Sequence, residues 1–235
     1  MKPKTKTTIQ GNNAISMSRF FRDVEPDVKE FILKSSAPLN LKQGQRLFER
    51  GDPGGVMYVI LDGRIEISMI NEAGRKISLN LIDAGNCFGE ISMFDHCART
   101  ASAVAVVPTQ LQPIYYETFI AAAKRCPVLA LTLIEILCER VRWVSDSVEE
   151  YALLSLERRL ARRLLMLQHK FLSDDGSIHI AQSDLADFAG SSRESTNKVL
   201  MQWKSMGLIT IGRRAILVLD NARLEHIAYE NHDAP

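Results

Sequence analysis

The spacing of apolar residues changes along the 235-residue chain and predicts different elements in its different parts. Val28, Phe31 and Ile32 recur at helical spacing after Pro26, and proline suits the first turn of a helix, so we expect a short helix here. Further on, apolar and polar residues alternate, which is typical of strands with one buried face. This alternation includes Ile65, Ile67 and Met69, then Ile77, Leu79 and Leu81, whereas Val56 to Leu61 form a more continuously apolar run.

Turn residues separate these expected strands at regular intervals. Asp62-Gly63 between two apolar runs is a strong hairpin signal. Similar breaks occur at Gly51 to Gly55, Ala73-Gly74 and Ala84-Gly85. The spacing predicts an antiparallel β-barrel or jelly roll over roughly residues 38–116, preceded by a polar tail over residues 1–13.

A long helix is expected after Cys126-Pro127. Apolar residues recur in it at alternating steps of three and four, which is the pattern of a parallel two-stranded coiled coil. Charged residues flank this stripe and leave it too narrow for deep burial, so we favour homodimerisation over the alternative, a helix packed on its own barrel. The pattern lapses from Ala152 to Ser155, where we expect a hinge. The stripe consists of Ile134, Leu137, Val141, Val144, Val148 and Tyr151.

The remaining chain predicts an amphipathic helix and a short strand, then two helices joined by a glycine turn, and finally a hairpin. An amphipathic helix with Leu160, Leu164, Leu167 and Phe171 comes first, and its arginines are expected to form a solvated face, with DNA phosphate contact as the less favoured alternative. These are Arg158, Arg159, Arg162 and Arg163. After a turn at Asp174 to Gly176 and a short strand at Ile178 to Ile180, a helix from Ser183 ends at Gly190, and Ser191 begins another that runs to about Met206. Leu208 to Ile211 and Ala215 to Leu219 form the hairpin, with Arg213 and Arg214 at its tip.

Composition narrows the class of protein only slightly. The 29 basic and 28 acidic residues nearly cancel, so any DNA-binding face must be local. No apolar run approaches membrane-spanning length and no signal-peptide core follows the amino-terminal lysines, so we expect a soluble, cytoplasmic protein without a membrane partner. Cysteines are too scattered for a disulfide framework or a zinc site, and we expect reduced structural thiols and no metal. They are Cys87, Cys97, Cys126 and Cys138.

Candidate ligand chemistry is concentrated in Phe88-Gly89-Glu90-Ile91-Ser92 and the nearby Arg99-Thr100-Ala101-Ser102. Gly89 allows close backbone approach to an anion, Glu90 can accept hydrogen bonds from a ribose hydroxyl, and Arg99 can pair with two phosphate oxygens at once. Together they suit a phosphorylated sugar. The alternative is an ordinary salt bridge between Glu90 and Arg99 across a β-hairpin.

These residues resemble the phosphate-binding cassette of cyclic-nucleotide-binding domains in the cyclic AMP receptor protein (CRP/FNR) family, and Gly51 to Gly63 resembles the family's β-roll. The resemblance implies cyclic AMP as the effector. Val144 stands where the family's best-known sensor has threonine, and Thr100 resembles the arrangement in cyclic-GMP-binding domains, so cyclic GMP remains open. The implied nucleotide contacts are Gly89, Glu90, Ile91, Ser92, Arg99, Thr100, Arg140, Val144 and Ser145.

The helix from Ser191 resembles the family's recognition helix, whose amino end enters the major groove. Arg193 can pair with guanine O6 and N7, and Glu194 can accept from cytosine N4. A capping box between Ser191 and Glu194 is the competing role for this carboxylate. The implied DNA contacts are Ser192, Arg193, Glu194, Ser195, Asn197 and Lys198, with Arg213 and Arg214 of the wing.

The resulting prediction is an α+β chain. It comprises an amino-terminal jelly-roll (β-roll) cyclic-nucleotide-binding domain over residues 1–126, a coiled-coil dimerisation helix over 127–152, and a winged helix-turn-helix domain over 153–235. The family resemblance implies a non-enzymatic, homodimeric regulator of a pseudo-palindromic DNA operator that contacts RNA polymerase. Three alternatives stay open: a family member with another effector such as haem, a cupin-type enzyme, and a ligand-independent DNA-binding protein. The cupin alternative is disfavoured because His96 is the only histidine before residue 169.

Overall fold

The computed structural model describes residues 19–72, 74, 76–171 and 175–229. The predicted tail over residues 1–13 and the predicted turn positions Ala73 and Asp174 lie outside them. Contacts divide the chain into two compact units, one containing residues up to 69 together with 79–141, the other 70–78 together with the chain from 142 onward. The division falls within a single helix, α5, which runs from Val128 to Leu153. The predicted domain limits at 126 and 152 stay predictions.

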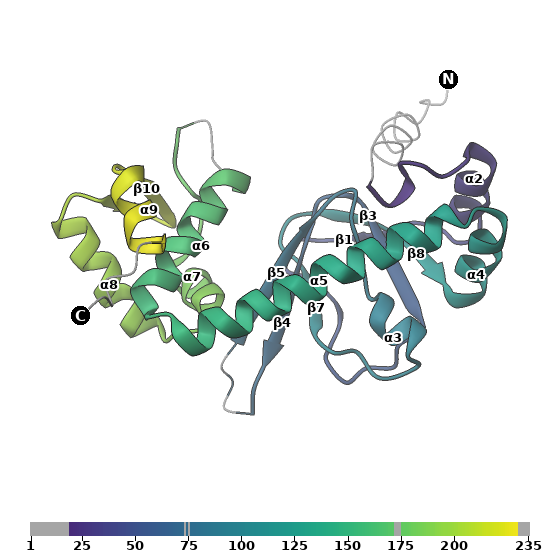
Figure 1. Ribbon diagram of the computed structural model, residues 1–235, viewed down its shortest axis with the longest axis horizontal. Coiled ribbons are helices and arrows are strands. Elements are labelled where there is room, and N and C mark those ends of the chain that lie inside the picture. The colour runs from purple at the N-terminus through teal and green to yellow at the C-terminus, as the bar shows by residue number, and fades with distance from the viewer. Residues whose placement is uncertain (1–18, 73, 75, 172–174, 230–235) are drawn as a thin grey trace, which may run out of the picture. The chain divides into compact units, whose positions relative to one another are not determined.

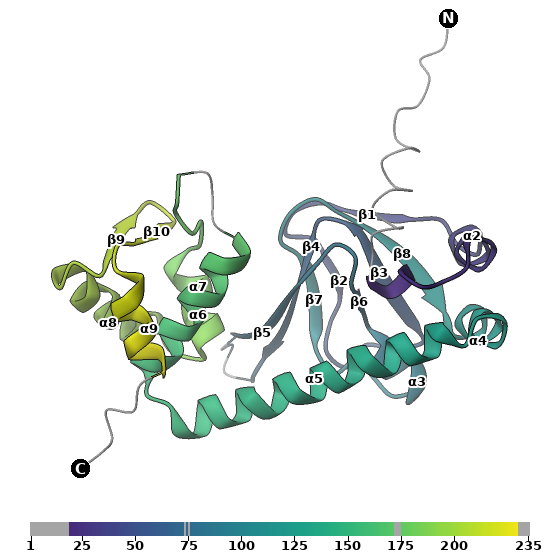
Figure 2. The ribbon, with the colours of Figure 1, turned by 45° about the horizontal axis from the view of Figure 1, so that its top comes forward.

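The first unit is built on two antiparallel four-stranded sheets, which confirms the predicted jelly-roll architecture (Figure 2). One sheet has the order β1-β8-β3-β6, with strands Leu39–Leu41, Thr109–Tyr115, Val56–Asp62 and Cys87–Phe88. The other has the order β2-β7-β4-β5, with strands Arg46–Phe48, Ser102–Ala105, Arg64–Ile70 and Lys76–Asp83.

Helices close one side of this unit. Figure 1 shows α2 (Pro26–Lys34), which was predicted, beside α4 (Tyr116–Arg125), which was not. With the short 3-10 helix η1 (Arg19–Phe21) and the first turns of α5 they share one apolar cluster. Its members include Phe20, Phe21, Ile32, Met57, Phe119 and Leu129, all at most 3% exposed.

Burial along β4 is less simple than its alternating sequence predicts. Ile65 is fully buried, but Ile67 and Met69 are only half-buried, whereas Glu66 and Ser68 are 6% and 2% exposed. Both faces of this strand are therefore covered, and the alternation predicts the strand correctly without predicting its buried face.

The second unit contains a helix-turn-helix followed by a two-stranded wing, as predicted (Figure 1). Its helices are α6 (Leu156–Phe171), α7 (Gln182–Ala189), α8 (Arg193–Ser205) and α9 (Asn221–Tyr229), the last of which was not predicted. Strands β9 (Ile209–Gly212) and β10 (Ala215–Val218) form the hairpin, and Ile178 adds one isolated bridge to Ile216. The core includes Leu160, Leu164, Leu185, Leu200 and Trp203.

Three arginines of α6 contradict the predicted solvated face. Their Nε atoms donate to carbonyl oxygens at or next to the carboxy-terminal ends of α7 and α9, where helices leave acceptors unpaired. This accounts for the half-burial of these side chains. The bonds run from Arg159 to Ala189 (3.0 Å), from Arg162 to Ala228 (3.1 Å) and from Arg163 to Phe188 (3.1 Å).

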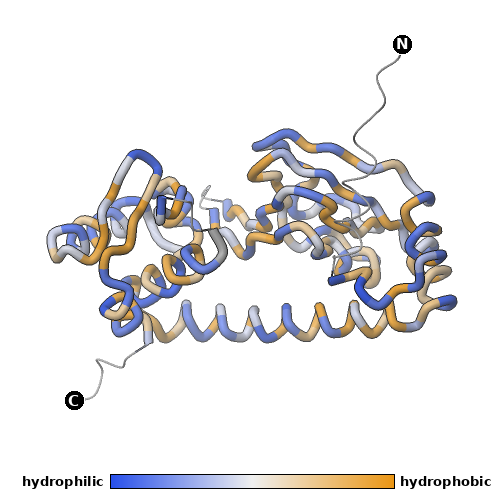
Figure 3. Tube along the Cα trace, turned by 90° about the horizontal axis from the view of Figure 1, so that it is seen from above, coloured by the Kyte–Doolittle hydropathy of each residue, from blue (hydrophilic) through white to orange (hydrophobic). Residues whose placement is uncertain are grey.

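The apolar stripe of α5 also differs in part from the prediction. Ile134, Val141, Val144 and Val148 are 51–66% exposed, as an unpartnered seam requires. Leu137 and Tyr151 are instead half-buried within the chain, Leu137 against the core of the first unit and the Tyr151 ring against Gly190, so their place in a seam stays a prediction. Leu131 and Cys138 are exposed at the same three-and-four spacing and extend the stripe. Figure 3 shows polar and apolar residues alternating along this helix.

Candidate nucleotide site and nucleic-acid interface

Gly89 permits the close contact on which the nucleotide cassette depends. It lies between β6 and the short helix α3 (Glu90–Phe94), with φ +80°. A Cβ atom at this position would lie 2.7 Å from Nη1 of Arg99. The Arg99 guanidinium therefore packs directly against Gly89, and only glycine combines this close approach with a positive φ.

Arg99 is held by two main-chain oxygens and a serine hydroxyl rather than by a carboxylate. Its Nη1 donates to Gly89 O and Ser92 Oγ, both at 2.8 Å, and its Nη2 donates to Val56 O at 2.7 Å. The guanidinium lies 4.2 Å from the ring centroid of Phe48, a cation–π contact. Arg99 is 5% exposed, and its desolvation lowers its pKa from the ordinary value. Arginine nevertheless stays charged in proteins, so this group is a fixed buried cation.

Glu90 pairs with Arg140 of α5, and the predicted alternative, a Glu90–Arg99 salt bridge, is wrong. The fully buried Glu90 accepts from Nη1 of Arg140 through Oε1, while Nη2 of Arg140 donates to Cys87 O. Burial, and then the nearby Glu90 charge, raises the pKa of the Cys87 thiol to about 12, which keeps it protonated. The ion pair ties α5 to the cassette.

Two polar atoms of this cassette are buried and lack a hydrogen-bond partner among the described residues. They are Oε2 of Glu90, an acceptor, and Nε of Arg99, a donor. Each unsatisfied buried group costs about 1–3 kcal/mol. A ligand with a hydroxyl donor and an anionic oxygen acceptor would satisfy both, and a ribose phosphate carries both groups.

The other predicted nucleotide contacts fall into three groups. Ser92 is buried and helps to hold Arg99, as described above. Ile91 and Thr100 are exposed beside the cassette. Val144 and Ser145 are exposed on the part of α5 that belongs to the second unit, so their contacts with a nucleotide stay predictions.

The amino end of α8 is capped differently from the predicted capping box. Ser192 is the N-cap, and its Oγ accepts from the Ser195 N–H at 3.1 Å and lies 3.0 Å from Ser195 Oγ. The helix therefore starts at Arg193, and the predicted box between Ser191 and Glu194 is wrong.

Helix α8 exposes one polar face. Four polar or charged residues on this face are exposed, as is required of a surface that contacts bases in the major groove of DNA. The opposite face is buried and includes Thr196, Leu200 and Trp203. The exposed residues are Arg193, Glu194, Asn197 and Lys198.

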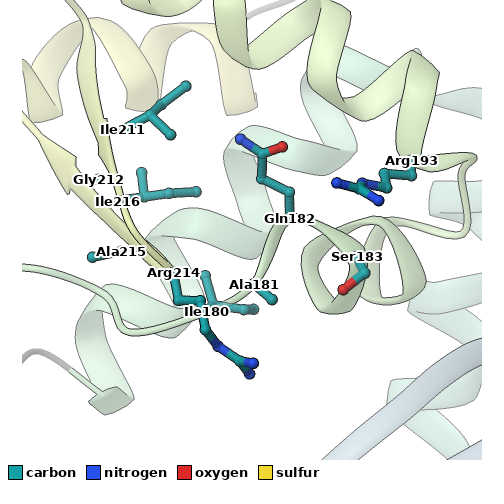
Figure 4. A pocket seen from close by; sticks show the side chains of 10 residues that line it. All are labelled: Ile180, Ala181, Gln182, Ser183, Arg193, Ile211, Gly212, Arg214, Ala215 and Ile216. Carbon is teal, nitrogen blue, oxygen red and sulfur yellow. The ribbon is translucent and has the colours of Figure 1, made fainter.

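A cavity of about 270 Å³ lies between α7, α8 and the wing (Figure 4). Arg193 borders it from α8 and Arg214 from the hairpin turn, where Arg214 has φ +55°. Nη2 of Arg214 is 3.8 Å from Asp184, a long pair between two exposed side chains. Gln182 and Ser183, in the uncapped first turn of α7, complete this rim.

Two arginines border this cavity, and Asp184 in the first turn of α7 lies near one of them. The unpaired N–H groups of a helix start add to the positive potential of the two arginines. The sequence did not predict that Gln182 and Ser183 border a cavity. The signal available for them was the start of a helix at a residue without a capping side chain.

Within the part of the chain that the structure describes, no helix is both long and apolar enough to span a bilayer. Among those same residues, no cluster of three or more His, Cys, Asp or Glu side chains could hold a metal ion. Cys87 and Cys126 are buried as expected of structural thiols, whereas Cys97 and Cys138 are exposed.

Comparisons with known proteins agree with this geometry. Residues 38–126 match the family model of the cyclic nucleotide-binding domain, and residues 158–227 match that of the Crp-like helix-turn-helix domain. The chain is 30% identical over 212 residues to the cyclic AMP receptor protein of Thermus thermophilus, covering 90% of this chain and 97% of that relative. It is 26% identical over 215 residues to the CRP-like cAMP-activated global transcriptional regulator of Mycobacterium tuberculosis, covering 89% and 96%.

A solved structure shows the same architecture. It is a transcriptional regulator of the CRP/FNR family from Thermus thermophilus, with a TM-score of 0.72 and 26% identity over 82% of this chain and 98% of that one. The chain therefore belongs to the CRP/FNR family of transcription regulators, with a cyclic nucleotide-binding domain and a Crp-like helix-turn-helix domain.

Proposed function

We propose that this protein is a homodimeric transcription regulator that binds a pseudo-palindromic DNA operator in response to a cyclic nucleotide, most simply cyclic AMP. The observation that carries the proposal is the pair of buried, unsatisfied atoms at Glu90 and Arg99. One needs a hydrogen-bond donor and the other an acceptor. The ribose 2′-hydroxyl and the cyclic phosphate of a 3′,5′-cyclic nucleotide supply these two groups on one rigid ring.

The charge of the ligand also suits the site. Nη1 and Nη2 of Arg99 already donate to protein oxygens, so its buried cation is oriented before a ligand arrives. The single negative charge of a cyclic phosphate would neutralise this cation without leaving a second anion buried. The names of two relatives, which refer to cyclic AMP, favour the adenine nucleotide. Thr100 and Val144 keep cyclic GMP open, for the reasons given from the sequence.

The exposed stripe on α5 supports a second copy of the chain as a partner. Leu131, Ile134, Val141 and Val148 expose 55–66% of their surface at three-and-four spacing. Such a stripe is buried when two parallel helices pack by knobs into holes. Ser145 is exposed on the same helix, and its contact with the base of a bound nucleotide stays a prediction.

For DNA, the exposed face of α8 would enter the major groove. Arg193, Glu194 and Lys198 would contact base edges, while Ser192, Ser195, Arg213 and Arg214 would contact phosphates. A dimer would place two such helices about 34 Å apart on successive major grooves. We expect a cytoplasmic location, as suits a regulator that binds DNA, and contact with RNA polymerase, as the family resemblance implies.

Calorimetric titration of the purified protein with cyclic AMP and with cyclic GMP tests the effector. We expect saturable binding of cyclic AMP, and Arg99→Leu should abolish it because both the cation and the Nε donor are lost. A control, Arg22→Leu, removes an exposed arginine outside the cassette. Absence of binding by either nucleotide would refute a cyclic-nucleotide effector.

A further inference from the structure

Glu150, in the last turns of α5, is a buried carboxylate that the proposed nucleotide and DNA contacts do not use. The residue is 9% exposed. Its Oε1 accepts from Nη1 of Arg162 at 3.3 Å, and its Oε2 accepts from Nη2 of Arg163 at 2.7 Å. Burial of charges is costly unless they are paired with good geometry, so this cluster resists rearrangement once formed.

The same two arginines also hold the ends of other helices. Nε of Arg163 donates to Phe188 O, near the end of α7, and Nε of Arg162 donates to Ala228 O, near the end of α9. Each guanidinium therefore bridges Glu150 to a helix end. Arg163 makes the bridge to the first helix of the helix-turn-helix.

The next residue of α5 contacts the turn itself. Gly190 is the left-handed residue that ends α7, with φ +61°, and a Cβ atom there would lie 2.5 Å from Cε1 of Tyr151. The Arg159 guanidinium lies 5.7 Å from the Tyr151 ring centroid and donates to Ala189 O. Glu150, through Arg163, and its neighbour Tyr151 thus contact the end of α7 and the glycine of the turn that precedes α8.

The connection from α5 to α6 is short and hydrogen-bonded. Only Leu154 and Ser155 separate the two helices, and Leu154 O accepts from Nη1 of Arg159 at 2.8 Å. The hinge expected from Ala152 to Ser155 therefore has few free backbone groups. A change in the direction of the end of α5 would be passed to the turn of the helix-turn-helix.

We propose that Glu150 is a positioning residue that couples the direction of α5 to the recognition helix through its bridge to Arg163. This inference rests on the proposed function, because the signal that it transmits is nucleotide binding at the cassette. Arg140 joins the cassette to α5 ten residues before Glu150. A continuous helix carries the change between them.

The test is the ratio of DNA affinities measured with and without saturating cyclic AMP. The DNA is a duplex selected from random sequences by the wild-type protein in the presence of cyclic AMP. Coupling free energies commonly correspond to about 5–150-fold. We expect Glu150→Gln to reduce the ratio by at least about fivefold and to leave cyclic AMP affinity without DNA within about twofold of wild type.

Two further variants separate coupling from loss of structure. Glu149→Gln makes the same chemical change at the neighbouring exposed residue and should retain the wild-type ratio. Arg163→Lys keeps the positive charge but removes the guanidinium, which donates to Glu150 and to Phe188 O through different nitrogens. It should reduce the ratio of DNA affinities as Glu150→Gln does. Thermal unfolding checks that each variant is folded at the assay temperature.

The possible results distinguish the claims. If Glu150→Gln weakens DNA binding equally with and without cyclic AMP, its role is structural and the inference is overturned. If cyclic AMP raises the DNA affinity of the wild-type protein, and raises it equally in Glu150→Gln and Arg163→Lys, the inference is overturned while the proposed function stands. A wild-type ratio of one overturns the proposed function and this inference with it.

Discussion

Replacing Glu90 by glutamine tests the proposed ribose contact with little change in side-chain volume. In the structure Oε1 of Glu90 accepts from Arg140 and Oε2 has no partner among the described residues. Because Arg140 can only donate, the glutamine oxygen should stay with Arg140, which leaves the amide nitrogen where the ribose hydroxyl is expected. The hydroxyl would then lose a charged acceptor and retain at most a neutral hydrogen bond.

The expected loss follows from the strengths of these bonds. Hydrogen bonds to charged groups contribute about 1.5–3 kcal/mol and neutral ones about 0.5–1.5 kcal/mol. The difference between the midpoints of these ranges, about 1.25 kcal/mol, predicts cyclic AMP binding about eightfold weaker in Glu90→Gln. Calorimetric titration measures this change directly. Glu139→Gln is the matched control, since Glu139 also pairs with an arginine, Arg19, but is exposed.

Titration with 2′-deoxy cyclic AMP makes the test specific to the hydroxyl. Wild type should bind this analogue more weakly than cyclic AMP, and Glu90→Gln should discriminate much less between the two. The losses from the mutation and from the missing hydroxyl should therefore be strongly non-additive. Fully additive losses would refute a contact between Glu90 and the ribose, whatever the size of the mutational effect.

Three other substitutions address the cassette, the seam and the recognition helix. Gly89→Ala should lower the free energy of unfolding by at least about 1–2 kcal/mol, because the left-handed backbone disfavours a side chain and the new methyl group meets Arg99. The same substitution should weaken nucleotide binding. Unchanged stability in a urea titration would contradict the close approach of Arg99 to Gly89. Val141→Glu should convert a dimer to a monomer in sedimentation velocity, since it places like charges across the seam, and a persistent dimer would exclude this stripe as the interface. Arg193→Ala should cost about 1–3 kcal/mol and relax specificity at one base pair in a binding assay on operator variants, whereas equal weakening on all sequences would assign Arg193 to phosphate.

The sequence predicted elements whose signal is local. Alternation and Asp-Gly turns predicted strands β3, β4 and β5, and Gly190 marked the end of α7. Helices α4 and α9 were missed. Helix α4 was missed although Tyr116, Phe119, Ile120 and Ala123 recur in it at helical spacing and pack against the core of the first unit.

Contacts between distant residues explain the remaining differences. A run of arginines in α6 resembles a solvated face in the sequence, because the carbonyl groups that accept from Arg159, Arg162 and Arg163 lie 5–66 positions away. The seam on α5 was predicted from apolar residues at alternating steps of three and four, and Leu137 fits this spacing although it packs against the core. Which side of α5 meets the core depends on the three-dimensional packing, which periodicity does not encode.

The candidate site shows the same division. Gly89, Glu90 and Arg99 were identified from their chemistry and from the family resemblance. Their actual partners, Val56 O for Arg99 and Arg140 for Glu90, are 43 and 50 positions away in the chain. The sequence therefore identified the groups, while the two unsatisfied atoms on which the proposed ligand rests are evident only in the structure.

The most direct test of the central claim is the affinity of the wild-type protein for its selected operator duplex, measured by fluorescence anisotropy with and without cyclic AMP at one fixed salt concentration. The account predicts that saturating cyclic AMP raises this affinity about 5–150-fold, and that DNA raises cyclic AMP affinity by the same factor. Equal DNA affinity in the two conditions, with cyclic AMP bound in calorimetry, would contradict nucleotide-dependent regulation.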